Sequence, residues 1–207
     1  MKTYLIEAIG TFFLVLVIGL TVAGGVALAP VAIGSTLMVM VYMGGHISGA
    51  HYNPAVTLGV LIRGKIGGKD AGIYMVSQVI GAVLAAAVSS WLAGSSIEVG
   101  PGEGVAVVKA LVAEILITFA LVSVMLNVAT SKDHPDNSFY GLAIGFTVMV
   151  GAFSVGPISG GAFNPAVALG HNIINGTLGN IWIYLLGPFA GGLLAAIVFK
   201  ITNPDDQ

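Results

Sequence analysis

Two copies of one tripeptide carry the residue types through which this chain could act on another molecule. They lie 111 positions apart and read Asn53-Pro54-Ala55 and Asn164-Pro165-Ala166. Asn is a preferred helix cap and Pro is favoured at the first helical position, so each copy predicts the start of a helix. A helix N-terminus presents unpaired N–H groups and about half of a positive elementary charge, and an Asn amide adds further donors. Such a pair can donate hydrogen bonds to a passing oxygen atom and repel cations.

Long apolar segments must position these two motifs. A membrane-spanning helix needs about 20 apolar residues. By that measure the sequence predicts six crossings, at Tyr4–Val22, Ala29–Gly45, Ala71–Leu92, Val105–Ala129, Phe139–Gly156 and Ile181–Ile201. The helices that begin at the motifs, Asn53–Ile62 and Asn164–Ile174, are too short to cross. We therefore predict an all-α membrane protein with six transmembrane helices plus two re-entrant half-helices.

The composition supports a membrane protein and excludes several other classes. The 207 residues are 57% hydrophobic and only 8% charged, whereas about a quarter of the residues in a soluble domain are charged. A net charge of −2 gives no reason to expect nucleic-acid binding. The chain has no cysteine, which excludes thiol catalysis, and its four histidines are not spaced as metal ligands. No nucleophile sits in a Ser-His-Asp arrangement, and no Gly-rich phosphate loop follows a strand, so we predict that the protein is not an enzyme.

The two halves of the chain repeat each other. Besides the Asn-Pro-Ala copies, the tripeptide that begins at Ala32 recurs at Ala143, again 111 positions later. We predict a single channel domain over residues 1–207, with repeat halves of about 1–102 and 103–207. Each half has three crossings, so the second half enters from the opposite side and forms an inverted repeat. The two half-helices then meet near the middle of the membrane.

The positions of the cationic residues predict the orientation. With the N-terminus inside, all but one of them fall on the cytoplasmic side: Lys2, Arg63, Lys65, Lys69, Lys132 and Lys200. Only Lys109 falls outside. Because cytoplasmic loops of membrane proteins are enriched in Lys and Arg, we expect a multi-pass protein of the cell membrane with both termini in the cytoplasm.

The loops before the two motifs predict what the protein does. Irregular backbone at membrane depth is tolerated only where it is buried in protein or lines a water-filled cavity. The predicted function is therefore passive, single-file conduction of small neutral molecules. Two alternatives stay open: a secondary transporter, which can also use inverted repeats and broken helices, and a non-conducting structural membrane protein.

Over essentially its whole length the sequence resembles the aquaporin and aquaglyceroporin family, the major intrinsic proteins. The resemblance rests on the paired Asn-Pro-Ala motifs, and the run from His46 to Thr57 is particularly similar to bacterial water channels. It implies a homotetramer with one pore per subunit and no cofactor. It also implies that the partners are water, small neutral solutes and the lipid bilayer.

The resemblance places an outer selectivity filter at four positions, Ile33, Ala152, Gly161 and Val167. Typical members have an Arg where this chain has Val167, and water-specific relatives tend to have an aromatic ring, a His and a small or polar residue at the other three. We therefore expect a filter that is unusually wide and apolar, and that admits glycerol or urea besides water. An apolar ring offers water no hydrogen bonds, so a filter closed by dewetting is the alternative outcome.

Three further residues are candidates for bracing the re-entrant loops. Glu7 and Glu114 are carboxylates inside the membrane, where ionisable groups are functional candidates by default. One role is a proton relay; the other, favoured by their repetition between the halves, is to accept hydrogen bonds from the loop backbone. We expect His46 to line the pore or brace the first loop, in preference to acting as a pH gate. No metal site is predicted.

Overall fold

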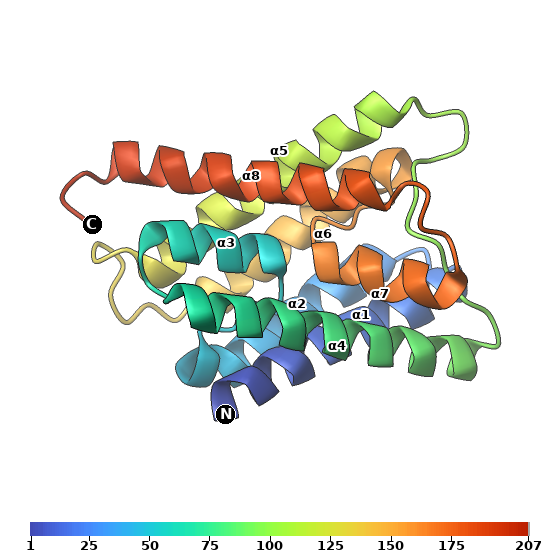
Figure 1. The fold of residues 1–207 in the computed structure, drawn as a ribbon, viewed down its shortest axis with the longest axis horizontal. Coiled ribbons are helices and arrows are strands. Elements are labelled where there is room, and N and C mark those ends of the chain that lie inside the picture. Colours follow the sequence, from blue (N-terminus) through green and yellow to red (C-terminus); the bar gives the residue numbers. More distant parts are fainter. Residues whose placement is uncertain (207) are drawn as a thin grey trace.

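The computed structural model describes residues 1–206, so that only Gln207, the last residue of the predicted domain, lies outside it. Eight helices follow one another in the described residues (Figure 1). Their bounds are α1 Lys2–Ala23, α2 Ala29–Ser48, α3 Pro54–Arg63, α4 Gly68–Ala93, α5 Val107–Thr130, α6 Tyr140–Ser159, α7 Pro165–Asn175 and α8 Ile181–Thr202.

Six of these helices are long and apolar enough to cross a membrane, and α3 and α7 are the two short ones. The predicted fold class is therefore confirmed. Helices α2 and α6 extend three residues beyond their predicted ends at Gly45 and Gly156. Each helix instead continues to a glycine in the left-handed conformation, Gly49 at φ 85° and Gly160 at φ 83°. Glycine adopts that conformation without steric cost and commonly follows the last turn of a helix.

The helices pack as two similar halves. Helix α1 packs against α4 and α5 packs against α8, whereas α2 and α6 contact each other across the two halves. The α2–α6 crossing is very close at Gly34 and Gly145. A Cβ atom on Gly34 would lie 2.6 Å from the carbonyl oxygen of Gly145, and a Cβ on Gly145 would collide with the carbonyl oxygen of Gly34. Small residues allow such close contact between helices in membrane proteins.

Helices α3 and α7 enter the bundle from opposite sides and begin near its centre. Figure 1 shows α3 and α7 with their starts toward the middle of the molecule, the C-terminus at the left and the N-terminus at the bottom, left of the centre. The side that holds both chain ends is named here the terminal side, and the opposite side the far side. Helices α3 and α7 are also in contact. The bundle therefore brings the two motifs together in its interior.

Candidate functional site

Both motifs start helices in the way that their residue types predict. Asn53 has an extended backbone, and its side-chain oxygen accepts a hydrogen bond from the N–H of Ala55 at 2.8 Å. Asn164 does the same for the N–H of Ala166 at 2.9 Å. In each case Pro occupies the first helical position, where a missing N–H costs nothing. The side-chain oxygen of each Asn thus caps its own helix, and its amide N–H groups remain available for other hydrogen bonds.

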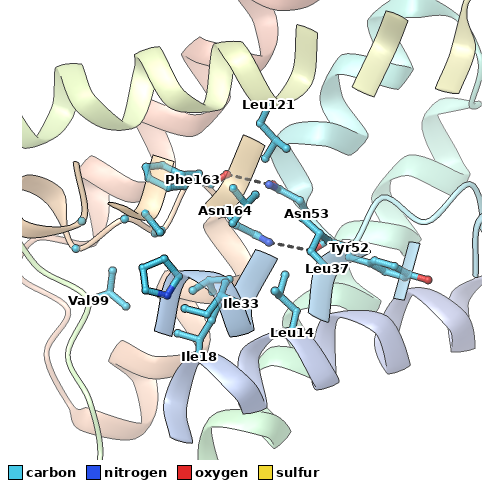
Figure 2. A pocket seen from close by; sticks show the side chains of 18 of the residues that line it. Leu14, Ile18, Ile33, Leu37, Tyr52, Asn53, Val99, Leu121, Phe163 and Asn164 are labelled. Atoms are coloured by element: carbon cyan, nitrogen blue, oxygen red, sulfur yellow. Dashed lines mark hydrogen bonds between the residues drawn. The ribbon is translucent and has the colours of Figure 1, made fainter. Parts of the chain in front are cut away.

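The two amides tie the half-helices to each other. The Asn53 amide donates to the carbonyl of Phe163 at 2.8 Å, and the Asn164 amide donates to the carbonyl of Tyr52 at 2.9 Å (Figure 2). An amide group carries two hydrogens, so one N–H on each Asn is left over. Both Asn side chains line a cavity. The site can therefore offer two hydrogen-bond donors to one molecule in that cavity.

That cavity has a volume of about 370 Å³ and reaches the far side, where Glu98 lines it. Most of its other lining side chains are aliphatic, and Figure 2 shows Leu14, Ile18, Ile33, Leu37, Val99 and Leu121 around the paired Asn residues. A second cavity, also of about 370 Å³, lies on the terminal side. The two cavities share lining residues, and the first of them also includes Asn53 and Asn164.

Glu7 holds the loop that precedes the first motif. The carboxylate is fully buried and accepts four hydrogen bonds. Its donors are the Ser48 hydroxyl at 2.7 Å, the backbone N–H of His51 at 3.0 Å and of Tyr52 at 2.7 Å, and the Gln78 amide at 2.8 Å. Tyr52 has a positive φ of 49°, which is uncommon for a residue with a side chain. These bonds stabilise a loop that has no regular structure of its own.

Glu114 does the same for the second loop. It is also fully buried, and it accepts hydrogen bonds from the Ser159 hydroxyl at 2.7 Å and from the backbone N–H groups of Ala162 at 3.1 Å and Phe163 at 2.7 Å. Phe163 has a φ of 50°, matching Tyr52 in the first loop. Both carboxylates are thus occupied by loop donors.

We compared the sequence of the chain with models of known protein families. The family model for "Major intrinsic protein" matches residues 1–199. This chain belongs to the major intrinsic protein family. Aquaporins and glycerol facilitators of this family are channels for water and small solutes, so this major intrinsic protein is a channel and not an enzyme.

Individual relatives of this major intrinsic protein include bacterial and plant proteins. It is 37% identical to "Glycerol uptake facilitator protein-like 6" of Lactiplantibacillus plantarum, over 100% of both chains. It is 38% identical to "Aquaporin NIP1-1" of Oryza sativa subsp. japonica, over 94% of this chain and 72% of that protein. Among solved structures, the aquaglyceroporin from Plasmodium falciparum shares the fold, with a TM-score of 0.87 at 19% identity over 98% of this chain and 97% of that one.

The four expected filter residues of this major intrinsic protein come from three helices and one loop. Ile33 lies on α2, Ala152 on α6, Val167 on the first turn of α7, and Gly161 in the loop before α7. All four line the cavity that reaches the far side. The structure thus brings together, around one cavity, four positions that carry no charge.

His46 is the one expected site residue that the structure places elsewhere. It is exposed on the last turn of α2, it lines neither cavity, and within residues 1–206 its side chain makes no hydrogen bond. The histidine at the first loop is instead His51, which is buried and lines both cavities. The helix continues past Gly45 to Ser48, and this continuation turns His46 outward.

A pair of tyrosines was not predicted from the sequence. The Tyr74 hydroxyl donates to the carbonyl of Ser48 at 2.9 Å, and the Tyr184 hydroxyl donates to the carbonyl of Ser159 at 2.5 Å. Each bond satisfies a carbonyl at the end of the helix that precedes a re-entrant loop. The signal that could have found them is the repeat itself, because α4 and α8 occupy equivalent places in the two halves.

Proposed function

We propose that this chain is a passive channel that conducts water and other small uncharged solutes, such as glycerol or urea, in single file past Asn53 and Asn164. The observation that carries the proposal is the reciprocal pair of amide hydrogen bonds, which leaves one N–H on each Asn to face the cavity. Two donors at one point of a narrow path are suited to a solute that carries an oxygen atom.

The same geometry opposes the passage of protons and cations. A water molecule that accepts from both amides cannot at the same time accept a hydrogen bond from the next water, so the chain of waters is interrupted there. The starts of α3 and α7 also face this point, and each contributes about half of a positive elementary charge. Both partial charges repel a cation in the cavity, and the positive ends of helix dipoles are a known electrostatic barrier in channels.

Ile33, Ala152, Gly161 and Val167 form, in this proposal, an outer filter that is wide and apolar. They line the cavity and carry no polar side-chain atom. The name of one relative, a glycerol uptake facilitator-like protein, supports solutes larger than water. A coupled transporter is disfavoured, because Glu7 and Glu114 are both engaged in hydrogen bonds to the re-entrant loops.

The proposal includes the assembly and orientation of the channel. All but one of the cationic residues belong to the terminal side, which supports a cytoplasmic location of both termini in the cell membrane. Membership of the family supports a homotetramer in which each subunit has its own pore.

The test is stopped-flow light scattering on proteoliposomes, which follows water efflux and then the entry of glycerol and urea. We expect all three to be faster than in empty vesicles. Val167→Arg should suppress glycerol and urea entry because it places a long charged side chain in the filter, whereas Val167→Leu, which adds bulk without charge, should reduce entry less. Water and solute fluxes that equal those of empty vesicles would refute the proposal.

A further inference from the structure

Two residues line both cavities, His51 and Met125. The cavity of the paired Asn residues ends at these side chains, and the cavity of the terminal side begins there. His51 comes from the loop between α2 and α3, and Met125 lies on α5. Both are buried, with exposed fractions of 6% and 3%. A solute that crosses the bundle must therefore pass between a loop residue and a helix residue that together separate the two cavities.

The His51 ring is held in one orientation by its neighbours. Its Nδ1 atom lies 3.1 Å from the Thr57 hydroxyl oxygen, which also accepts from the Gln78 amide at 3.0 Å. The Thr57 hydroxyl donates its single hydrogen to the carbonyl of Asn53 at 3.0 Å. The hydrogen between His51 and Thr57 must therefore come from the ring, so Nδ1 carries the proton and Nε2 is a hydrogen-bond acceptor.

The Nε2 atom makes no hydrogen bond within residues 1–206 and lies beside a residue that lines the cavity of the terminal side. A Cβ atom on Gly49 would lie 3.3 Å from it, and Gly49 lines the cavity of the terminal side. The His51 ring also packs edge-on against Tyr74, with ring centroids 5.2 Å apart. The His51 ring thus has a fixed orientation and offers one hydrogen-bond acceptor atom, Nε2, to a solute.

Met125, the other residue that lines both cavities, is apolar and flexible. It belongs to an apolar cluster that includes Val60, Leu121 and Leu126. Its side chain is unbranched and has three rotatable bonds, so it can adapt to what passes, but its bulk remains in the path.

We infer that this channel selects solutes by size at His51 and Met125, on the terminal side of the paired Asn residues, and that it favours solutes with an O–H or N–H group. The inference rests on the proposed function. A solute first accepts hydrogen bonds from the amides of Asn53 and Asn164 and then comes to the acceptor atom of His51. A molecule that both accepts and donates hydrogen bonds can therefore bind at each of these two places. An aprotic molecule of the same size has no hydrogen to give to Nε2.

The test compares glycerol with the longer polyol erythritol in proteoliposomes. Met125→Ala should raise the ratio of erythritol to glycerol permeability at least about fivefold, because it removes the bulk that sets the barrier height. Leu126→Ala is the matched control: Leu126 follows Met125 on α5, is fully buried and lines neither cavity. It should leave the ratio within about twofold of that of the original chain.

A second variant keeps the packing volume closer to that of the original. The chain has no cysteine, so Met125→Cys introduces a single reactive thiol. Its modification with a methanethiosulfonate reagent should abolish glycerol entry, and a reductant should restore it. Glu103→Cys, at an exposed position in the loop between α4 and α5, should be modified without loss of flux.

The outcomes separate this inference from the proposed function. An original chain that conducts neither water nor glycerol refutes both. A chain that conducts, but whose permeability ratio is unchanged in Met125→Ala and whose flux survives complete modification of Met125→Cys, refutes the inference alone. In the same assay, entry of dimethyl sulfoxide as fast as that of urea refutes the preference for hydrogen-bond donors.

Discussion

Asn53 and Asn164 each donate a hydrogen bond to the carbonyl that immediately precedes the other, at 2.8 Å to Phe163 and 2.9 Å to Tyr52. These two hydrogen bonds fix the half-helices relative to each other. Replacing either Asn removes one of the two bonds. The same side chains line the cavity through which a solute must pass. Positioning and solute contact thus depend on the same two amide groups.

Replacing one of these amides by a carboxylate should damage the central barrier. Asn164→Asp removes the donor to the Tyr52 carbonyl and puts a negative charge between the two positive helix ends. We expect water flux to fall and cation leak to rise, measured by stopped-flow light scattering and by a potential-sensitive dye in proteoliposomes. Asn53→Asp, the equivalent change in the other half, should act in the same direction. Unchanged flux together with unchanged cation exclusion would rule out this mechanism.

The buried carboxylates should matter for stability. Glu7→Gln replaces an acceptor of four hydrogen bonds by a group that must turn an N–H toward one of the same donors. A hydrogen bond to a charged group contributes about 1.5–3 kcal/mol, so we expect a loss of at least about 2 kcal/mol in the free energy of unfolding. Thermal unfolding in detergent, followed by circular dichroism, measures it.

Glu103→Gln is the control for this loss, because Glu103 is exposed in the loop between α4 and α5. It should leave the unfolding temperature unchanged. Equal unfolding temperatures for Glu7→Gln and Glu103→Gln would show that Glu7 does not stabilise the loop.

The close crossing of α2 and α6 should not tolerate a side chain on its glycines. Gly34→Ala places a Cβ atom 2.6 Å from the backbone oxygen of Gly145, and backbone cannot rotate away as a flexible side chain can. Overpacking typically costs about 1–3 kcal/mol, so the midpoint of thermal unfolding should fall. Gly72→Ala on α4 is the control, since its Cβ meets nothing within 4 Å. There the higher helix propensity of Ala should leave stability equal or slightly raised. A Gly34→Ala protein as stable as Gly72→Ala would contradict the close contact.

An ion pair on the terminal side predicts a pH dependence. The Asp206 carboxylate accepts a hydrogen bond from the backbone N–H of Lys132 at 2.8 Å and pairs with Arg63 at 2.6 Å. The Lys132 N–H, followed by the Ser131 hydroxyl and then the Arg63 guanidinium, holds the pKa of Asp206 below its ordinary value of 3.8. A lowered pKa means that the stabilisation is fully present above the ordinary pKa and is lost as the pH falls through the lower value of the folded protein.

Asp206→Asn should therefore lower the unfolding temperature at pH 7, and the difference from the original chain should shrink below a pH of about 3.8. Thermal unfolding at a series of pH values measures this, with Asp205→Asn, an exposed neighbour, as control. A difference that stays constant from pH 7 to pH 3 would mean that the Asp206 charge does not contribute.

The parts of the fold that were predicted from the sequence are those that depend on local rules. Asn53 and Asn164 before Pro predicted the half-helix starts, and the apolar segments predicted the spans. The course of α2 past Gly45 was missed, because glycine within a helix and glycine after it look alike until the backbone conformation is known. His46 was misplaced for the same reason.

Contacts between distant segments could not be predicted in this way. His51 and Met125 line the same two cavities although 74 positions separate them, and no local pattern indicates that this part of α5 lies beside the loop. The pairing of Arg63 with Asp206 is separated by 143 positions and likewise depends on how α3 and α8 pack.

The exchange of hydrogen bonds between the halves also bears on how the protein is made. A ribosome that has synthesised only the first three crossings has produced Asn53 and the Tyr52 carbonyl, but neither Phe163 nor Asn164. The first half-helix then lacks the partners that fix its end, and unpaired polar groups are costly within a bilayer. We expect it to reach its final position only after the second half has been inserted, so that the passage is assembled as the last step of biogenesis.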